Sequence, residues 1–162
     1  MRTMLFVGAL SVVAGLGVGA GERSAQGTPS SPAATLEGTW RVEITVRNCD
    51  TGQPVFNTPF PALASFARGG TLTTSDGGMS PAARGAGHGV WWRSQGRTFA
   101  ALTEAFTFGP TGVRTGTQRL SQEIELDHQG MAFQSRIASV VLDTAGQVTF
   151  TGCATSIGRR LD

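Results

Sequence analysis

The chain has 162 residues, of which 40% are hydrophobic and 15% charged, with 23 Gly and 7 Pro. This composition is typical of one globular domain and excludes collagen-like and charge-rich disordered chains. All 13 basic residues are Arg, which excludes chemistry that requires Lys, such as a Schiff base or a P-loop. The formal net charge is only +2, and the Arg residues are scattered among acidic ones, so we expect no nucleic-acid partner.

The first 20 residues form a candidate secretory signal peptide. Met1-Arg2 is a short basic start, and residues 4–20 are uncharged and largely apolar. Small residues suit cleavage at Val18-Gly19-Ala20, or as late as residue 27. A membrane anchor is the alternative, but the run is short and Gly-rich, so we expect no stable anchor. Residues 21–35 predict a flexible linker, and the protein is expected to be secreted or periplasmic.

Residues 36–162 predict a single all-β domain. Trp40, Val42, Ile44 and Val46 alternate with polar residues, which is the period of a half-buried strand. Eight strands with mostly short connections and no significant helix predict an antiparallel up-and-down barrel, because closure removes both sheet edges; a sandwich is the alternative. After the first strand the expected strands are 60–67, 71–75, 90–94, 97–108, 116–126, 131–142 and 147–160, and the long loops are 49–59 and 76–89.

The two cysteines test this closure. By strand parity Cys49 and Cys153 both point outward, at the ends of the first and the last strand. In an exported protein such a pair is expected to form a disulfide; two free thiols are the alternative. If the cysteines lie directly opposite each other, Trp40 faces Asp162 and lies diagonal to Arg160.

The segment Leu36-Glu37-Gly38-Thr39-Trp40 resembles the opening of calycin barrels, in which lipocalins carry Gly-x-Trp on the first strand. Arg160 resembles the Arg that packs over this Trp in lipocalins. The resemblance implies an eight-stranded barrel with Trp40 and Arg160 at one end. It does not distinguish a lipocalin-like from an avidin-like branch. Only two residues follow Arg160, where lipocalins have a helix, and the Tyr of avidin-like biotin sites is absent.

Glu104 is the one catalytic candidate. It shares strand parity with Leu102, Phe106 and Phe108, and a carboxylate buried in an apolar cavity would suit proton transfer. The alternatives are an ion pair with an Arg or a position at the rim. His88 could be a haem or metal ligand or a general base, but we favour a loop residue beside Trp91-Trp92. No zinc-binding or nucleophile-elbow spacing occurs, so no metal and no cofactor are expected.

The expected function is that of a secreted or periplasmic barrel that binds a small, mostly apolar molecule. Aromatic walls would supply contact area, and a few polar groups would orient the ligand. One alternative is an isomerase or cyclase that acts in the same cavity, as in the allene oxide cyclase and dirigent barrels of the same strand number. Another is a domain with a filled interior that binds a protein. The expected ligand-binding residues are Trp40, Trp91, Trp92, Leu102, Glu104, Phe106, Gln118, Gln122 and Phe133.

Overall fold

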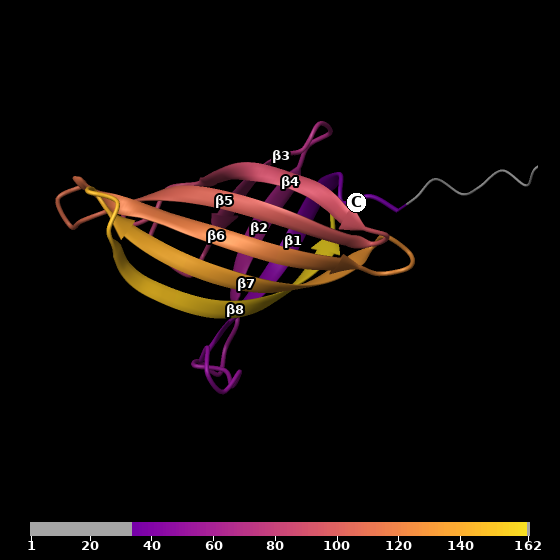
Figure 1. Ribbon diagram of the computed structural model, residues 1–162, viewed down its shortest axis with the longest axis horizontal. Helices are drawn as coiled ribbons and strands as arrows, with labels where there is room; N and C mark the ends of the chain where they lie inside the picture. Colours follow the sequence, from indigo (N-terminus) through magenta and orange to yellow (C-terminus); the bar gives the residue numbers. More distant parts are fainter. Residues whose placement is uncertain (1–33, 162) are drawn as a thin grey trace, which may run out of the picture. The chain divides into compact units, whose positions relative to one another are not determined.

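The computed structural model describes residues 34–161, and these form one closed antiparallel barrel of eight strands (Figure 1). The expected fold class is confirmed. The expected signal peptide and most of the linker lie outside the described residues. The strands are β1 (Gly38–Arg47), β2 (Phe60–Phe66), β3 (Thr71–Asp76), β4 (Gly87–Gln95), β5 (Thr98–Phe108), β6 (Arg114–Leu126), β7 (Ala132–Asp143) and β8 (Val148–Arg160).

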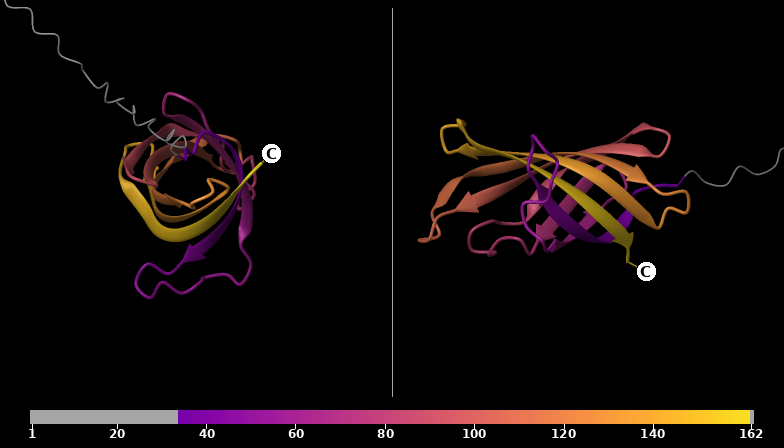
Figure 2. Two further views of the ribbon diagram at one scale, coloured as in Figure 1. Left: turned by 90° about the vertical axis from the view of Figure 1, so that its right-hand side faces the viewer. Right: turned by 90° about the horizontal axis from the view of Figure 1, so that it is seen from below.

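Each strand pairs with its neighbours in sequence, and β1 closes the barrel against β8. Strands β5 to β8 are longer than β1 to β4. They run side by side across the view of Figure 1, and Figure 2 shows the same strands from two further directions. Residues 34–161 contain no helix long and apolar enough to cross a membrane.

Strands β4 and β6 begin earlier than the sequence predicts, at Gly87 instead of residue 90 and at Arg114 instead of residue 116. Residues 87–89 belong to β4 rather than to the expected 76–89 loop, and His88 lies opposite Glu104 of β5. The glycines that indicated a loop serve close packing instead. A Cβ at Gly89 would lie 1.9 Å from the Leu102 carbonyl oxygen, so only glycine fits this ladder.

Aromatic side chains fill the barrel at the end where β1 starts. Trp40 is completely buried, and its ring lies 5.0 Å from that of Phe133. Phe66 packs edge-on against both Phe133 and Trp91. The buried cluster is completed mainly by Leu36, Val42, Leu72, Phe99, Ile124 and Leu126. Because these side chains pack against each other, this end of the barrel is a hydrophobic core.

Arg160 lies over this core. Its guanidinium carbon is 4.4 Å from the centre of the Trp40 ring, so the expected contact is present. Its nitrogens also donate to the carbonyl oxygens of Thr35, Glu37 and Gly130. Gly38 has a φ of 128°, which L side chains rarely adopt, and a Cβ there would lie 2.5 Å from the Arg160 Nη1. The glycine of the Gly-x-Trp segment is therefore required by backbone conformation and by the path of Arg160.

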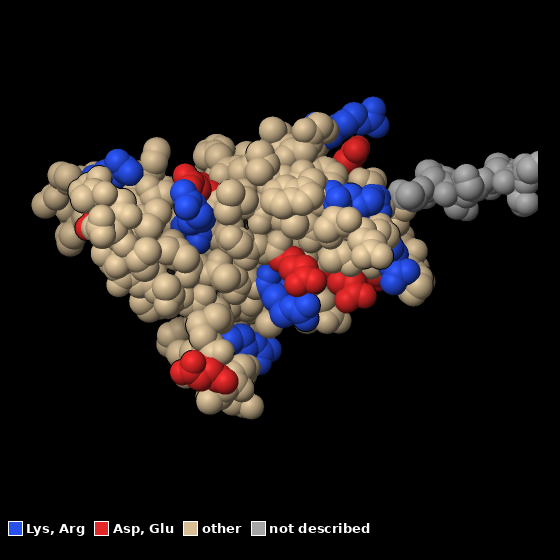
Figure 3. All heavy atoms as spheres, viewed as in Figure 1, with Lys and Arg blue, Asp and Glu red and all other residues tan. Residues whose placement is uncertain are grey.

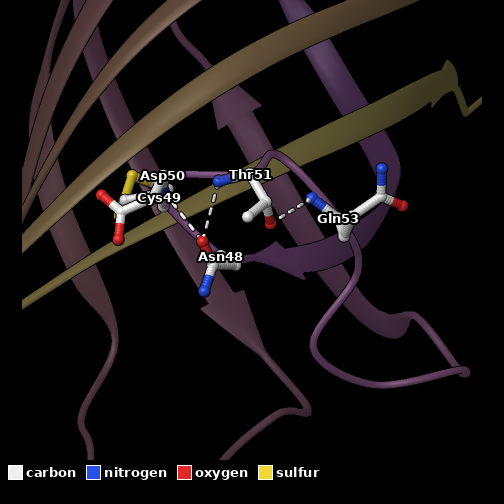
Figure 4. Close-up of a disulfide and its surroundings, with 6 residues drawn as sticks. Asn48, Cys49, Asp50, Thr51 and Gln53 are labelled. Atoms are coloured by element: carbon white, nitrogen blue, oxygen red, sulfur yellow. Dashed lines mark hydrogen bonds between the residues drawn. A yellow bond between two sulfur atoms is a disulfide. The ribbon is translucent and has the colours of Figure 1, made fainter.

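The disulfide between Cys49 and Cys153 is present, as expected, and joins the end of β1 to β8 (Figure 4). The register differs from the one expected for directly opposed cysteines. Trp40 lies opposite Arg160, and Cys153 lies opposite Arg47, so the disulfide bridges a diagonal. Cys49 lies in a loop, residues 48–53, that follows β1. There the Asn48 Oδ1 accepts hydrogen bonds from the backbone N–H groups of Asp50 and Thr51, both at 2.9 Å.

The expected orientation of β5 is wrong. Phe99, Ala101, Thr103 and Ala105 are its buried, inward residues, whereas Glu104 and Phe106 on the alternate face are exposed. Large apolar side chains occur on both faces of this strand, so hydrophobicity alone did not distinguish them. The interior of a small barrel has room for only small side chains at many positions, and Ala101 and Ala105 occupy such positions on the inner face.

Candidate functional site

The candidate site is a hollow on the outer face of the barrel, of about 750 Å³, which we call the outer groove. Two cross-strand rows of outward residues form its floor. One row runs from Leu102 through Ser121 and Ala138 to Cys153, and the other begins at Trp92 and Ala100. Loop residues Asn48, Cys49 and Gly52 line the side opposite Trp92.

The groove exists because small side chains lie between large ones. Ala100, Ser121 and Ala138 leave the middle of the floor low, while the half-exposed Trp92 rises at one end. The disulfide holds the 48–53 loop at the other end. The floor is therefore mainly apolar, and burying it on a ligand would be favourable.

Charged groups border the groove on one side. Arg136 donates to the Glu123 carboxylate at 3.1 Å, and both side chains are largely exposed. Arg47 bonds to the Thr155 hydroxyl at 3.0 Å and is half-buried. The charged side chains of both signs are interspersed with uncharged surface on this face (Figure 3).

These same four residues, Arg47, Glu123, Arg136 and Thr155, also line a second hollow of about 430 Å³. We call it the polar hollow. Its other outward-facing residues include Glu43, Thr45, Glu125 and Gln134, which carry most of its hydrogen-bonding groups. The two hollows thus share a polar border, with an apolar surface on one side of it and a polar surface on the other.

A second polar region lies inside the barrel. Arg84 points inward, with its side chain 4% exposed, and its Nη1 lies 2.6 Å from the Asp76 carboxylate. Its Nε donates to the Gln118 side-chain oxygen, and the Gln118 amide donates to Ser139. Arg84 and Asp76 were not predicted from the sequence, because residues 76–89 show no periodicity. The lone Arg within a Gly- and Ala-rich stretch was the one available signal.

The other expected interior glutamine is also engaged. Gln122 donates to the Ser135 hydroxyl at 2.8 Å, and Ser135 bonds to Ser156 at 2.7 Å. Ser135 and Ser156 are buried. Both glutamines therefore bond to serines on neighbouring strands, which satisfies polar groups inside the barrel.

The residues expected to bind one ligand do not form one site. Trp40 and Phe133 belong to the closed core, Trp91 packs against Phe66 and Phe99, and both glutamines face inward. Trp92 and Leu102 line the outer groove, and Gln122 also contributes to its lining. The remaining two, Glu104 and Phe106, lie on the outer face away from it.

Glu104 does not lie in an apolar cavity. Its carboxylate is 2.6 Å from an Arg119 nitrogen, and both side chains are about half exposed. The alternative of an ion pair with an Arg is therefore the observed one. This removes the geometric basis for Glu104 as a general acid or base inside the barrel.

His88 is exposed on β4. In residues 34–161 no three His, Cys, Asp or Glu side chains gather in an arrangement that could hold a metal ion. Comparisons with known protein families and with curated proteins find no match to this chain. The functional assignment therefore depends on the geometry of the chain itself.

Proposed function

We propose that the protein is a secreted or periplasmic barrel that binds a small, mostly apolar molecule in the outer groove. The single observation that carries the proposal is the apolar floor between Trp92 and the disulfide-bonded loop. Its volume of about 750 Å³ lies within the range of about 300–1,000 Å³ common for small-molecule sites. The disulfide is compatible with an oxidising compartment outside the cytosol.

The ligand would place its apolar body on Trp92, Leu102 and Ala138. A polar group would lie at the border, where Arg47 and Arg136 offer donors and Glu123 offers an acceptor. Trp92 is the principal contact, because a half-exposed indole loses the most apolar surface on binding. This proposal keeps the apolar ligand expected from the sequence but moves it from the interior to the outer face.

Titration with the neutral fluorescent probe N-phenyl-1-naphthylamine tests the proposal. We expect saturable binding to the wild-type protein, and Trp92→Ala should weaken it about tenfold or more. Ala138→Trp should also block binding, because the added indole fills the groove while Trp92 and Leu102 stay in place.

Phe106→Ala is the matched control. Phe106 is 56% exposed and Trp92 50%, both on the outer face, but Phe106 lies outside the groove. Its truncation should leave probe affinity unchanged. Equal losses in Phe106→Ala and Trp92→Ala would show non-specific adsorption to exposed aromatic rings and would overturn the proposal. So would an Ala138→Trp variant that binds the probe normally.

A further inference from the structure

The outer groove and the polar hollow are parts of one continuous outer surface, built from three neighbouring cross-strand rows. The first row is formed by Arg47, Cys153, Ala138, Ser121 and Leu102. The second row is formed by Thr45, Thr155, Arg136, Glu123, Ala100 and Trp92. The third row is formed by Glu43, Ile157, Gln134, Glu125 and Thr98. The outer groove lies over the first and second rows, and the polar hollow lies over the second and third.

The polarity of this surface changes from row to row. The first row has small or apolar side chains between Arg47 and Leu102, whereas the third row is polar except for Ile157. In the second row the Arg136 and Glu123 side chains pair at 3.1 Å. Successive rows lie two residues apart along each strand, so the first and the third row are about 13 Å apart. A ligand that covers all three rows must therefore be apolar at one end and polar at the other.

The third row offers hydrogen-bonding groups that the barrel itself does not use. Glu43, Glu125 and Gln134 are exposed and line the polar hollow. Within residues 34–161 the four ion pairs include none of these three side chains, and neither do the side-chain hydrogen bonds on this face. A carboxylate accepts hydrogen bonds, and an amide both donates and accepts them. These side chains are therefore available to a polar ligand group.

The charges that line the polar hollow favour a neutral polar group. Its lining contains two guanidinium groups, of Arg47 and Arg136, against three carboxylates, of Glu43, Glu123 and Glu125. A group with one sign of charge is attracted by part of this lining and repelled by the rest. A hydroxyl donates to a carboxylate and accepts from a guanidinium or an amide, so it is complementary to every one of these side chains. A neutral group with several hydroxyls therefore fits the polar hollow best.

We propose that the outer groove and the polar hollow together bind a sugar-headed amphiphile, with its alkyl tail on the first row and its sugar on the third. This inference rests on the proposed function and adds the chemical class of the ligand. Ile157, 50% exposed, contacts the C–H face of the sugar ring. Gln134 lies beside Ile157, and Glu125 beside Gln134, so both bond to the hydroxyls of that sugar. The Arg136–Glu123 pair lies where the tail joins the sugar.

Isothermal titration calorimetry with three amphiphiles of the same tail, each below its critical micelle concentration, tests this inference. The probes are n-octyl β-D-glucoside, octyl sulfate and octyltrimethylammonium. The glucoside should bind about tenfold or more tightly than either ionic probe, because only its head is complementary to both signs of charge. Methyl β-D-glucoside has the sugar without the tail and should give no measurable binding in the same range.

Variants of the third row give the sharper result. Glu125→Gln should weaken octyl glucoside binding about tenfold and Gln134→Ala about threefold, because a hydrogen bond to a charged acceptor is the stronger one. The affinity for N-phenyl-1-naphthylamine, which has no sugar, should not change. Glu104→Gln and Gln129→Ala are the matched controls, because both residues are exposed and lie outside the two hollows. They should bind both ligands like the wild type.

Equal affinities of the three octyl probes would overturn the inference. So would Glu125→Gln and Gln134→Ala variants that lose no more octyl glucoside affinity than Glu104→Gln and Gln129→Ala. Either result, together with normal binding of N-phenyl-1-naphthylamine, would leave the outer groove as a site for apolar molecules. A wild-type protein that binds neither the naphthylamine probe nor octyl glucoside would overturn the proposed function and this inference together.

Discussion

The contact between Arg160 and Trp40 makes the most quantitative prediction for stability. Arg160→Ala removes hydrogen bonds to the carbonyl oxygens of Thr35, Glu37 and Gly130, together with the contact on the indole ring. A hydrogen bond to a charged group contributes about 1.5 kcal/mol or more, and a cation–π contact about 0.5–2 kcal/mol. Water can rehydrate the freed carbonyls, so we expect a loss of about 3–4 kcal/mol rather than the full sum.

Arg160→Lys should lose about 2 kcal/mol. The ammonium keeps the charge but cannot reach all three carbonyl oxygens or stack as a plane on the indole. Arg159→Ala should change stability by no more than about 0.5 kcal/mol, because Arg159 is exposed on the outer face opposite Arg41.

Urea unfolding followed by circular dichroism gives these values. Circular dichroism is preferred because loss of Arg160 changes Trp40 fluorescence directly. The melting temperature of Arg160→Ala should fall by about 10–15 °C. If Arg159→Ala destabilises the barrel as much as Arg160→Ala, the reasoning that Arg160 ties residues 35–37 to the core is refuted.

Three further predictions concern separate parts of the barrel. Paired Cys49→Ser and Cys153→Ser changes should cost about 4–5 kcal/mol in urea unfolding, because the disulfide spans 104 residues; an unchanged midpoint would contradict this. Asp76→Asn leaves the Arg84 guanidinium buried without its carboxylate and should cost about 3–5 kcal/mol, whereas Glu104→Gln, in an exposed pair, should cost under about 0.5 kcal/mol; equal losses would contradict the difference in burial. Desolvation acts to raise the pKa of Asp127, but backbone hydrogen bonds from residues 129–132 outweigh it and lower that pKa. The ionised Asp127 carboxylate therefore stabilises the fold at pH values above the pKa that Asp127 has in the unfolded chain. This stabilisation is lost as the pH falls through the pKa that Asp127 has in the folded protein, so the difference in unfolding free energy between wild type and Asp127→Asn should shrink in acid. A difference independent of pH would contradict this.

The sequence predicted the barrel well because its clearest patterns lie in the strands that close it. Trp40, Val42 and Ile44 show a single apolar face, and the parity of the two cysteines pointed to a junction of first and last strands. Both inferences depend only on the alternation of a strand, which is a local property. The exact register depends on how far β1 and β8 slide past each other, and the diagonal disulfide shows why a directly opposed pair was the wrong assumption.

The site was harder to predict because it depends on which face of β5 points inward. Leu102 and Phe106 on one face are larger than Ala101 and Ala105 on the other, so size favoured the wrong face. The volume available inside the barrel decides this orientation, and it is a property of the closed structure. The outer groove likewise comes from small residues on three strands beside a projecting loop, and no single stretch of sequence contains that arrangement.

The indole N–H resonances of the three tryptophans test the central claim most directly. Trp92 lines the outer groove, whereas Trp40 is buried and donates to the Leu36 carbonyl, and Trp91 packs against Phe66 and Phe99 and donates to the Ala67 carbonyl. Titration of ¹⁵N-labelled protein with N-phenyl-1-naphthylamine should shift the Trp92 indole signal and leave those of Trp40 and Trp91 in place. Shifts confined to Trp40 and Trp91 would place the ligand inside the barrel and contradict the outer groove as the binding site.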